Sequence, residues 1–218
     1  MASHLLFLLL MPLLLVPPVF ASFGSWVESF CGRYGHEFLV VVPQSFICDP
    51  VVGNSLFRLM DLSPLHEEAL RFLSGLPGSN IDCAHNAEHQ RVCEEVYLAL
   101  HARYVMTAEG MASVKSLFER GRYGTCPRIL CRGQHLLPLG QHDAFRRSRC
   151  ITFCPRCREI YYPASRSLGR IDGAAFGTTF PHLLLLAHPH LQPPEPSPNL
   201  PANKYIPRVF GFPVCPKG

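Results

Sequence analysis

The sequence predicts an α+β fold, with an all-helical N-terminal domain followed by a four-cysteine zinc ribbon and an extended C-terminal segment. Three observations support this prediction: apolar residues recur at helical spacing in the first half, two pairs of cysteines follow in the second half, and a proline-rich stretch precedes the last residues. We divide the chain into four parts: an apolar leader or divergent N-terminus at 1–22, a helical domain at 23–121, a zinc ribbon at 122–187, and a linker with a C-terminal segment at 188–218.

The composition is that of a globular protein. The chain has 218 residues, of which 48% are apolar and 17% charged, which excludes wholesale disorder and allows one domain or two small ones. Ten cysteines are too few for a disulfide-dense scaffold. Those outside the two pairs show no paired spacing, and we expect them to be reduced thiols: Cys31, Cys48, Cys83, Cys93, Cys150 and Cys215.

The N-terminus leaves two interpretations open. Residues 5–20 form an apolar run of signal-peptide length, and small residues follow it, where a peptidase could cut. Against a signal peptide, no lysine or arginine precedes the run, and Pro12, Pro17 and Pro18 interrupt it. The run is also short and broken for a membrane span. The segment is therefore either a cleaved leader or a divergent N-terminus.

Three helices are expected between 63 and 121. The first begins at Ser63, with proline at its first helical position, and ends in the glycine-containing stretch 75–78. The second covers 88–106, where residues four apart form one apolar face: Val92, Val96, Leu100 and Tyr104. The third is capped by Thr107 and ends at Gly121. These apolar faces predict a helical core.

The two cysteine pairs predict one structural zinc ion. Cys126 and Cys131 are followed, after 22 residues, by Cys154 and Cys157, a spacing that lets two turns supply four thiolates to a tetrahedral metal. A proline after the first cysteine of each pair favours such a turn. Because all four ligands are sulfur, no position is left for a reactive water. The alternative is two disulfides in a secreted chain. Cys150 matches the ligand spacing less well, so we expect it to stay a free thiol.

Arginines cluster around the second cysteine pair: Arg146, Arg147, Arg149, Arg156 and Arg158. A run of this kind is more often a solvated face than a phosphate track, and a net charge of +4 is mild. The alternative function is a zinc-ribbon nucleic-acid-binding protein that uses Arg146, Arg147 and Arg149. Its binding would weaken steeply with salt.

The C-terminal part is predicted to be a spacer that carries an aromatic element. Residues 188–201 are rich in proline and should form an extended linker, and a short strand or hairpin is expected at 205–212. Strand alternation would place Phe210 and Phe212 on one face. Exposed aromatic residues on a tethered strand indicate docking to a partner, because a few aromatic anchors dominate many interfaces. The pattern equally allows this face to pack on its own domain.

A series of motifs between 25 and 212 resembles the regulatory beta subunit family of casein kinase II. In order, they are WVESFCG at 26–32, GHEF at 35–38, LHARY at 100–104, GTCPR at 124–128, DG at 172–173, FGT at 176–178, FPH at 180–182, PAN at 201–203 and PRVFGF at 207–212. The zinc spacing matches the family as well. The resemblance covers nearly all of the chain after 1–22, so it is specific.

The resemblance implies a non-catalytic regulator of a serine/threonine protein kinase. In that family the zinc ribbon forms a homodimer, and the C-terminal segment docks catalytic subunits, giving a tetramer of two regulatory and two catalytic chains that acts on protein substrates in the cytoplasm and nucleus. A cleaved leader would instead place the chain in the secretory pathway. The implied dimer contacts are Pro127, Ile129 and Ile160, and the implied anchors for the catalytic subunit are Phe210 and Phe212. We expect no catalytic residues, since the sequence has no glycine-rich nucleotide loop and no kinase catalytic motifs.

Several departures from the family pattern limit what can be carried over. The N-terminal phosphorylated serine-acid stretch of the family is replaced by the apolar run at 1–22. The acidic loop of the family is replaced by residues 75–83, which contain a single acid, Asp82. One carboxylate cannot create the strong negative potential that attracts polycations. Phe210 stands where tyrosine is more usual, and Pro213 removes a strand donor. We therefore expect weaker docking than is usual in the family.

Overall fold

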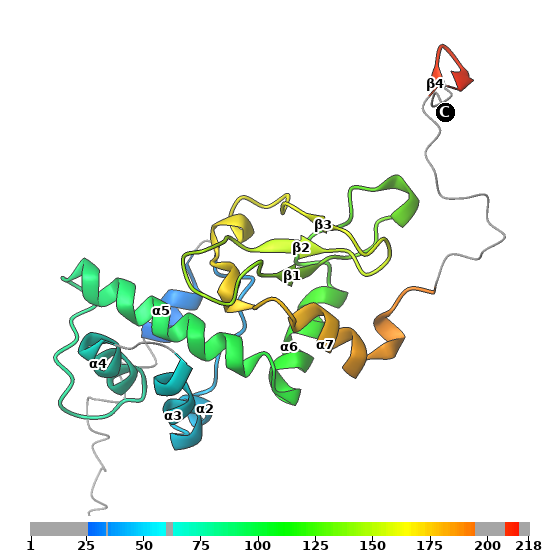
Figure 1. The fold of residues 1–218 in the computed structure, drawn as a ribbon. Helices are drawn as coiled ribbons and strands as arrows, with labels where there is room; N and C mark the ends of the chain where they lie inside the picture. Colours follow the sequence, from blue (N-terminus) through cyan, green and yellow to red (C-terminus); the bar gives the residue numbers. More distant parts are fainter. Residues whose placement is uncertain (1–25, 34, 60–62, 195–207, 214–218) are drawn as a thin grey trace, which may run out of the picture.

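The computed structural model describes residues 26–33, 35–59, 63–194 and 208–213 (Figure 1). It is a mixed helix and sheet structure, as the sequence predicted. The proposed leader at 1–22 lies outside the described residues. Within the described ranges, no helix combines the length and the apolar character needed to cross a membrane.

Helices make up the first half of the described chain. A helical stretch at 26–31 is followed by α2 (Gln44–Ile47), α3 (Pro50–Leu59), α4 (Pro64–Leu73), α5 (Ala87–Tyr104) and α6 (Ala108–Glu119). The three expected helices correspond to α4, α5 and α6, whereas α2, α3 and the helical stretch at 26–31 were not predicted. Figure 1 shows α5 as the long helix of this half, with α3 and α4 beside it.

Helix caps explain where α5 and α6 begin. The Thr107 hydroxyl accepts a hydrogen bond from the Gly110 N–H at 3.1 Å, so the predicted cap of α6 is confirmed. Asn86 caps α5 by accepting from the N–H groups of Glu88 and His89, so α5 begins at Ala87. Ser63 occupies the cap position of α4, but its hydroxyl contacts His66 Nδ1 instead of a backbone N–H. The predicted helix start at Ser63 is confirmed, but its side chain does not cap the helix.

The second half contains a small antiparallel sheet and short helices. Strands β1 (Leu137–Leu139), β2 (Ile151–Phe153) and β3 (Ile160–Tyr161) lie in the order β1-β2-β3, and Phe153 is paired with both Leu137 and Ile160. Helix α7 (Phe180–Ala187), for which no helix was predicted, packs on β1. The 3-10 turns are η1 (Ile129–Cys131), η2 (Leu168–Arg170), η3 (Gly173–Ala175) and η4 (Pro189–Leu191). Because η4 lies at the start of the linker predicted at 188–201, the prediction of an extended chain is wrong for these first residues.

One hydrophobic core contains residues from both halves. It extends from Trp26 and the buried face of α5 to Phe153 in β2 and Leu185 in α7. Helix α5 packs on α4 and on η3, and Figure 1 shows the sheet alongside it. A second, smaller buried cluster consists of Cys126, Cys131, Cys154 and Leu136. The domain boundary at 121/122 stays a prediction, since the larger core crosses it.

The last described residues form a two-stranded hairpin, β4 (Arg208–Val209) and β5 (Phe212–Pro213). Its two-residue turn is Phe210-Gly211, with φ values of 50° and 85°. Positive φ at both central residues is the geometry of a type I′ turn, whose twist suits tight hairpins. Phe210 is therefore a turn residue, and the prediction that strand alternation puts Phe210 and Phe212 on one face is wrong. Pro213 is nevertheless paired with Arg208 in this hairpin.

Candidate metal centre and docking surfaces

The four predicted ligand cysteines come together and could hold a metal ion. Their Sγ atoms all lie within 4.8 Å of one another, and the Cys126–Cys157 and Cys131–Cys154 sulfurs are each 3.9 Å apart. Sulfur ligands at about 2.3 Å from a tetrahedral zinc are ~3.8 Å apart, so the observed spacing suits that geometry. None of the four is in a disulfide. The donor set therefore fits a thiolate-bound structural metal.

Tight turns direct the two pairs of sulfurs toward each other. In the first turn, the Cys131 N–H donates to the Arg128 carbonyl at 2.8 Å. In the second, the Arg158 N–H donates to the Cys154 carbonyl at 2.8 Å. The residue after the last cysteine of each turn has positive φ, 51° at Arg132 and 59° at Arg158. The two turns thus reverse the chain in the same way, although only the second pair has the short C-x-x-C spacing.

The thiols of this cluster differ in acidity. Burial raises the pKa of Cys154 to about 11. Burial also opposes ionisation of Cys157, but a hydrogen bond with the Tyr161 hydroxyl at 3.2 Å and further hydrogen bonds outweigh it and lower the pKa of Cys157 to about 7. A metal must displace protons from the thiols that it binds. Tyr161 is thus a further residue of the site, and the cysteine spacing alone gave no indication of it.

Apolar side chains are exposed beside the cysteine turns. Ile129, in η1, is 87% exposed, and Ile160, in β3, is 51% exposed. Pro127 is also exposed, as are two apolar residues that the sequence did not single out, Leu130 and Tyr162. Exposed apolar residues that lie close together mark interaction surfaces more often than isolated ones do.

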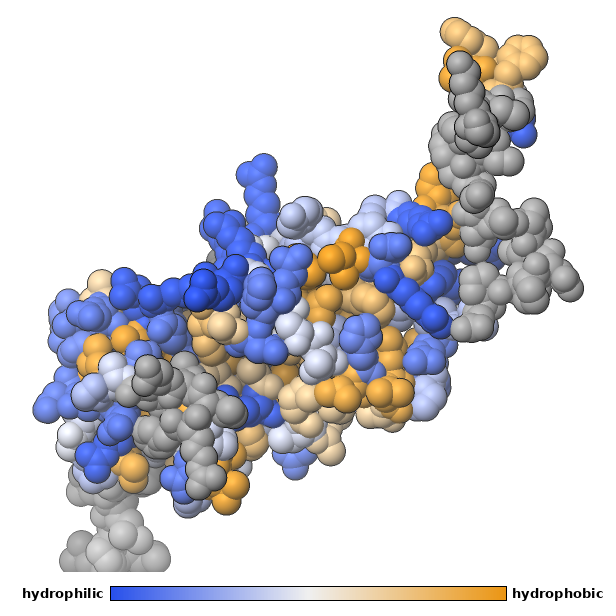
Figure 2. Space-filling model, in the orientation of Figure 1, coloured by the Kyte–Doolittle hydropathy of each residue, from blue (hydrophilic) through white to orange (hydrophobic). Residues whose placement is uncertain are grey.

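The C-terminal hairpin also exposes its aromatic residues. Phe210 is 97% exposed and Phe212 is 75% exposed, and Val209, which pairs with Phe212 in the hairpin, is exposed as well. In Figure 2 most of the described part of the hairpin is coloured as hydrophobic. Of the two interpretations left open by the sequence, packing of Phe210 and Phe212 on the described residues of the same chain is not observed. They remain free to contact a partner.

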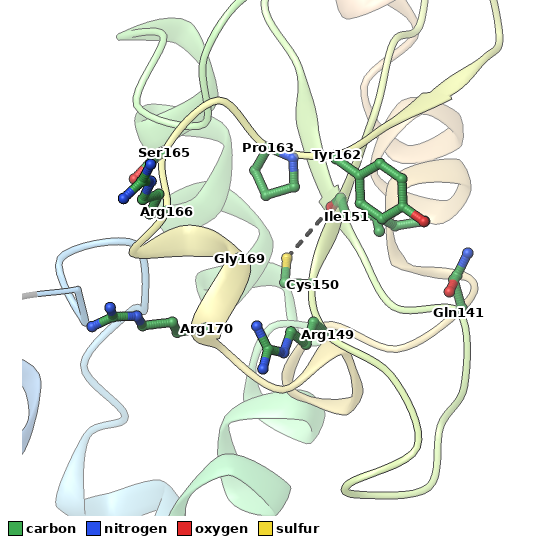
Figure 3. A pocket seen from close by; sticks show the side chains of 10 residues that line it. All are labelled: Gln141, Arg149, Cys150, Ile151, Tyr162, Pro163, Ser165, Arg166, Gly169 and Arg170. Atoms are coloured by element: carbon green, nitrogen blue, oxygen red, sulfur yellow. Dashed lines mark hydrogen bonds between the residues drawn. The ribbon is translucent and has the colours of Figure 1, made fainter.

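Two arginines of the cluster have different surroundings. Arg146 forms an ion pair with Glu95 of α5. Arg149 lines a pocket of about 560 Å³ together with Arg166 and Arg170, and Figure 3 shows Cys150 and Tyr162 at the same pocket. The ion pair with Glu95 neutralises the charge of Arg146 and does not favour the nucleic-acid alternative. Cys150 itself is buried outside the metal cluster and is free, as expected.

Two features of the described chain were missed by sequence reasoning. The first is His101, a fully buried residue of α5 whose ring accepts from the Val40 N–H and donates to the Ala175 carbonyl. The second is the pair Cys83 and Cys93, whose Sγ atoms are 3.2 Å apart. Both are free thiols, as expected, although their spacing in the sequence gave no indication that they lie in contact. Cys215 lies outside the described residues.

Comparisons with known proteins identify the family to which the chain belongs. A family model described as the casein kinase II regulatory subunit matches residues 25–213. The putative casein kinase II subunit beta-4 of Arabidopsis thaliana is 39% identical over 196 residues, which cover 87% of this chain and 65% of the plant protein. Casein kinase II subunit beta of Dictyostelium discoideum is 34% identical over 191 residues, covering 87% of this chain and 68% of that protein. The chain thus spans about two thirds of the length of these relatives. It belongs to the casein kinase II regulatory subunit family.

Proposed function

We propose that this chain is a non-catalytic regulatory subunit of the casein kinase II holoenzyme, which dimerises through a zinc ribbon and binds catalytic subunits through its C-terminal hairpin. Membership of the family supports the general role. The observation that carries the proposal is the four-thiol cluster, with exposed apolar residues beside its turns. Protein substrates of the kinase would be bound or selected within the assembled complex.

Zinc is the proposed metal because four sulfur ligands at this spacing suit a tetrahedral, redox-inert ion. Cys126, Cys131, Cys154 and Cys157 would hold it, and its role would be to fold the ribbon. Few other apolar contacts fix these turns, since the buried cluster around the thiols is small. Metal binding should therefore also position Pro127, Ile129 and Ile160 for contact with a second copy.

Docking is assigned to Phe210 and Phe212. A type I′ turn presents Phe210 at the tip of the hairpin, and Phe212 follows in β5, so both side chains can enter a partner's pocket without moving other residues. Aromatic anchors of this kind often contribute about 2 kcal/mol or more each to binding. The cost of holding Phe210 at positive φ is already met in the free hairpin, which favours binding without rearrangement.

We also propose that the chain acts in the cytoplasm and nucleus. The support is chemical: an all-thiol metal cluster and free cysteines in the described part of the chain suit a reducing compartment. Secretion is the competing outcome. N-terminal sequencing of the expressed chain distinguishes the two, because a start near Ser22 would indicate a cleaved leader, whereas an intact Met1 or Ala2 would not.

Co-purification with a casein kinase II catalytic subunit tests the docking proposal. The double variant Phe210→Ala, Phe212→Ala should lose at least tenfold in affinity, with its metal content and oligomeric state unchanged. The matched control is Val51→Ala, another exposed apolar residue, located in α3, which should bind normally. Equal retention of kinase by the double variant and the wild type would refute the assigned anchors.

Light scattering on the purified chain tests the dimer. Ile129→Asp should give a monomer that still holds its metal, and removal of zinc by a chelator should dissociate the wild type. Val41→Asp, at another exposed apolar site, serves as the control and should stay dimeric. A stable dimer of Ile129→Asp, or a folded dimer without metal, would contradict the proposed interface.

A further inference from the structure

Two thiols outside the metal cluster lie in direct contact. Cys83 belongs to the loop between α4 and α5, and Cys93 lies in α5, and their Sγ atoms are 3.2 Å apart. Cys93 is fully buried and Cys83 is partly buried. Figure 1 shows this loop passing beside α4 before it enters the N-terminal end of α5. The contact therefore joins the loop to the helix that forms the centre of the helical half.

Hydrogen bonds fix the loop around Cys83, and one of them connects it to α5. The Asp82 N–H donates to His89 Nδ1 in α5 at 3.0 Å, and the Asp82 carboxylate accepts from the N–H of Ala84 at 3.0 Å. The Ser79 hydroxyl donates to the Glu68 carbonyl in α4. These contacts bring Cys83 to Cys93 without help from the sulfur atoms themselves.

The buried indole of Trp26 borders the same pair. Its Nε1 has no hydrogen-bond partner among the residues that the structure describes, and it lies close enough to Cys83 to influence the pKa of that thiol. Trp26 is the one tryptophan of the chain, and it stacks on Phe30 with ring centroids 5.1 Å apart. A change at the two sulfurs should therefore be visible in tryptophan fluorescence.

We propose that Cys83 and Cys93 form a reversible disulfide that fastens the α4–α5 loop to α5. A disulfide has its sulfurs about 2.05 Å apart, so the two thiols must approach by only ~1.2 Å. The loop can supply this movement, because residues 79–82 are in neither a helix nor a strand and Cys83 lies in a turn. Cys93 stays fixed in the core.

The oxidant in this proposal is a small disulfide such as glutathione disulfide. The Cys83 thiolate attacks one of its sulfurs, forming a mixed disulfide and releasing one glutathione. The Cys93 thiolate then attacks the Cys83 sulfur and releases the second glutathione. Two protein thiols are oxidised by two electrons, the glutathione disulfide is reduced, and the two thiol protons end on the two glutathiones formed. Because Cys93 is buried beside Cys83, it can resolve the mixed disulfide without exposure to solvent.

Burial makes this exchange slow at neutral pH. It raises the pKa of Cys83, and the carboxylates of Asp82 and Glu94 act in the same direction, although the neighbouring Cys93 thiol and Trp26 indole partly offset them. The thiolate that must attack is therefore scarce at pH 7. Oxidation is best carried out near pH 8 and for hours, with the metal present.

The test uses the full chain with its metal bound, equilibrated with glutathione redox buffers and then alkylated. The expected product is a Cys83–Cys93 cross-linked peptide in mass spectrometry, together with weaker Trp26 fluorescence and a midpoint of thermal unfolding raised by about 5 °C. Reduction with dithiothreitol should reverse all three. Cys83→Ser and Cys93→Ser should each abolish the fluorescence change, whereas Cys48→Ser, at an exposed cysteine bonded to the Ser74 carbonyl, should retain it.

Three results would overturn the proposal. They are alkylation of both thiols after oxidation, a stable glutathione adduct on Cys83 with Cys93 still reduced, and a cross-link from either residue to a different cysteine. Zinc content is measured in the same samples, so that oxidation of Cys126, Cys131, Cys154 or Cys157 is recognised by metal release. The peptide assay identifies the linked cysteines directly and therefore decides the question even if a serine variant is unstable.

Discussion

His101 should make the stability of this protein depend on pH. Its ring is fully buried in α5, with Nε2 accepting from the Val40 N–H at 3.0 Å and Nδ1 donating to the Ala175 carbonyl at 2.8 Å. This arrangement requires a neutral ring with its proton on Nδ1, because a charged ring cannot accept from Val40. Burial, opposed only by the bond to Ala175, lowers the pKa of His101 to about 4 from an ordinary value of 6.5.

The sign and size of the effect follow from these two pKa values. Between pH 6.5 and pH 4 the unfolded chain binds a proton at His101 and the folded chain does not, so the free energy of unfolding decreases as the pH falls. The contribution of His101 is complete above pH 6.5 and is lost at up to about 1.4 kcal/mol per pH unit. From pH 7 to pH 5 the loss amounts to about 2 kcal/mol for this one group.

Urea unfolding at a series of pH values, followed by circular dichroism, measures this loss. The matched variant is His101→Gln, whose side chain can accept and donate hydrogen bonds but does not titrate. Other acidic and thiol groups contribute equally to both proteins, so the difference between them isolates His101. The wild type should lose about 2 kcal/mol more than His101→Gln from pH 7 to pH 5. Parallel pH profiles for the two proteins would refute the account of a buried neutral imidazole.

Two further pairs of substitutions test the packing and the caps. Gly140→Ala should destabilise the fold by about 3 kcal/mol, because an added Cβ would lie 2.3 Å from the Gly173 carbonyl oxygen. The control is Gly53→Ala, whose Cβ would meet only Leu70 at 3.8 Å and which should not lower the free energy of unfolding. Thr107→Ala should cost about 1 kcal/mol in thermal or urea unfolding, and Ser63→Ala clearly less, since only Thr107 bonds a backbone N–H of its helix. Equal losses at the two caps would contradict that distinction.

The features that the sequence predicted well depend on neighbours in the chain. The cap at Thr107, the apolar face of α5 and the two cysteine turns each follow from residues only a few positions apart. Even the four-thiol cluster requires only one long-range contact, the one between the two turns, because each turn by itself already places its two sulfurs close together. Apolar spacing and turn chemistry act over that range, so they can be recognised without a structure.

The features that were missed depend on tertiary contacts or on backbone geometry. The role of His101 is set by Val40 and by Ala175, which is 74 residues away. Cys83 and Cys93 meet because Asp82 and His89 fix the loop on α5, a contact that spacing alone does not indicate. Phe210 was placed in a strand because aromatic residues favour strands, whereas the hairpin uses it at positive φ in the turn. These roles depend on contacts with residues distant in the sequence or on turn geometry, and neither can be recognised from the spacing of neighbouring residues.

The same long-range contacts bear on how the metal centre should be studied. The Tyr123 hydroxyl, just before the first ligand turn, donates to the Phe38 carbonyl, and the Tyr123 ring packs edge-on against Phe176. His101 of α5 bonds Ala175, so the helical half supplies partners for groups beside the sheet. A fragment cut at residue 122 would lose these partners and expose apolar core residues such as Phe176 and Phe180. Aggregation of such a fragment would then resemble dimerisation through Ile129 and Ile160, and only the whole chain can separate the two.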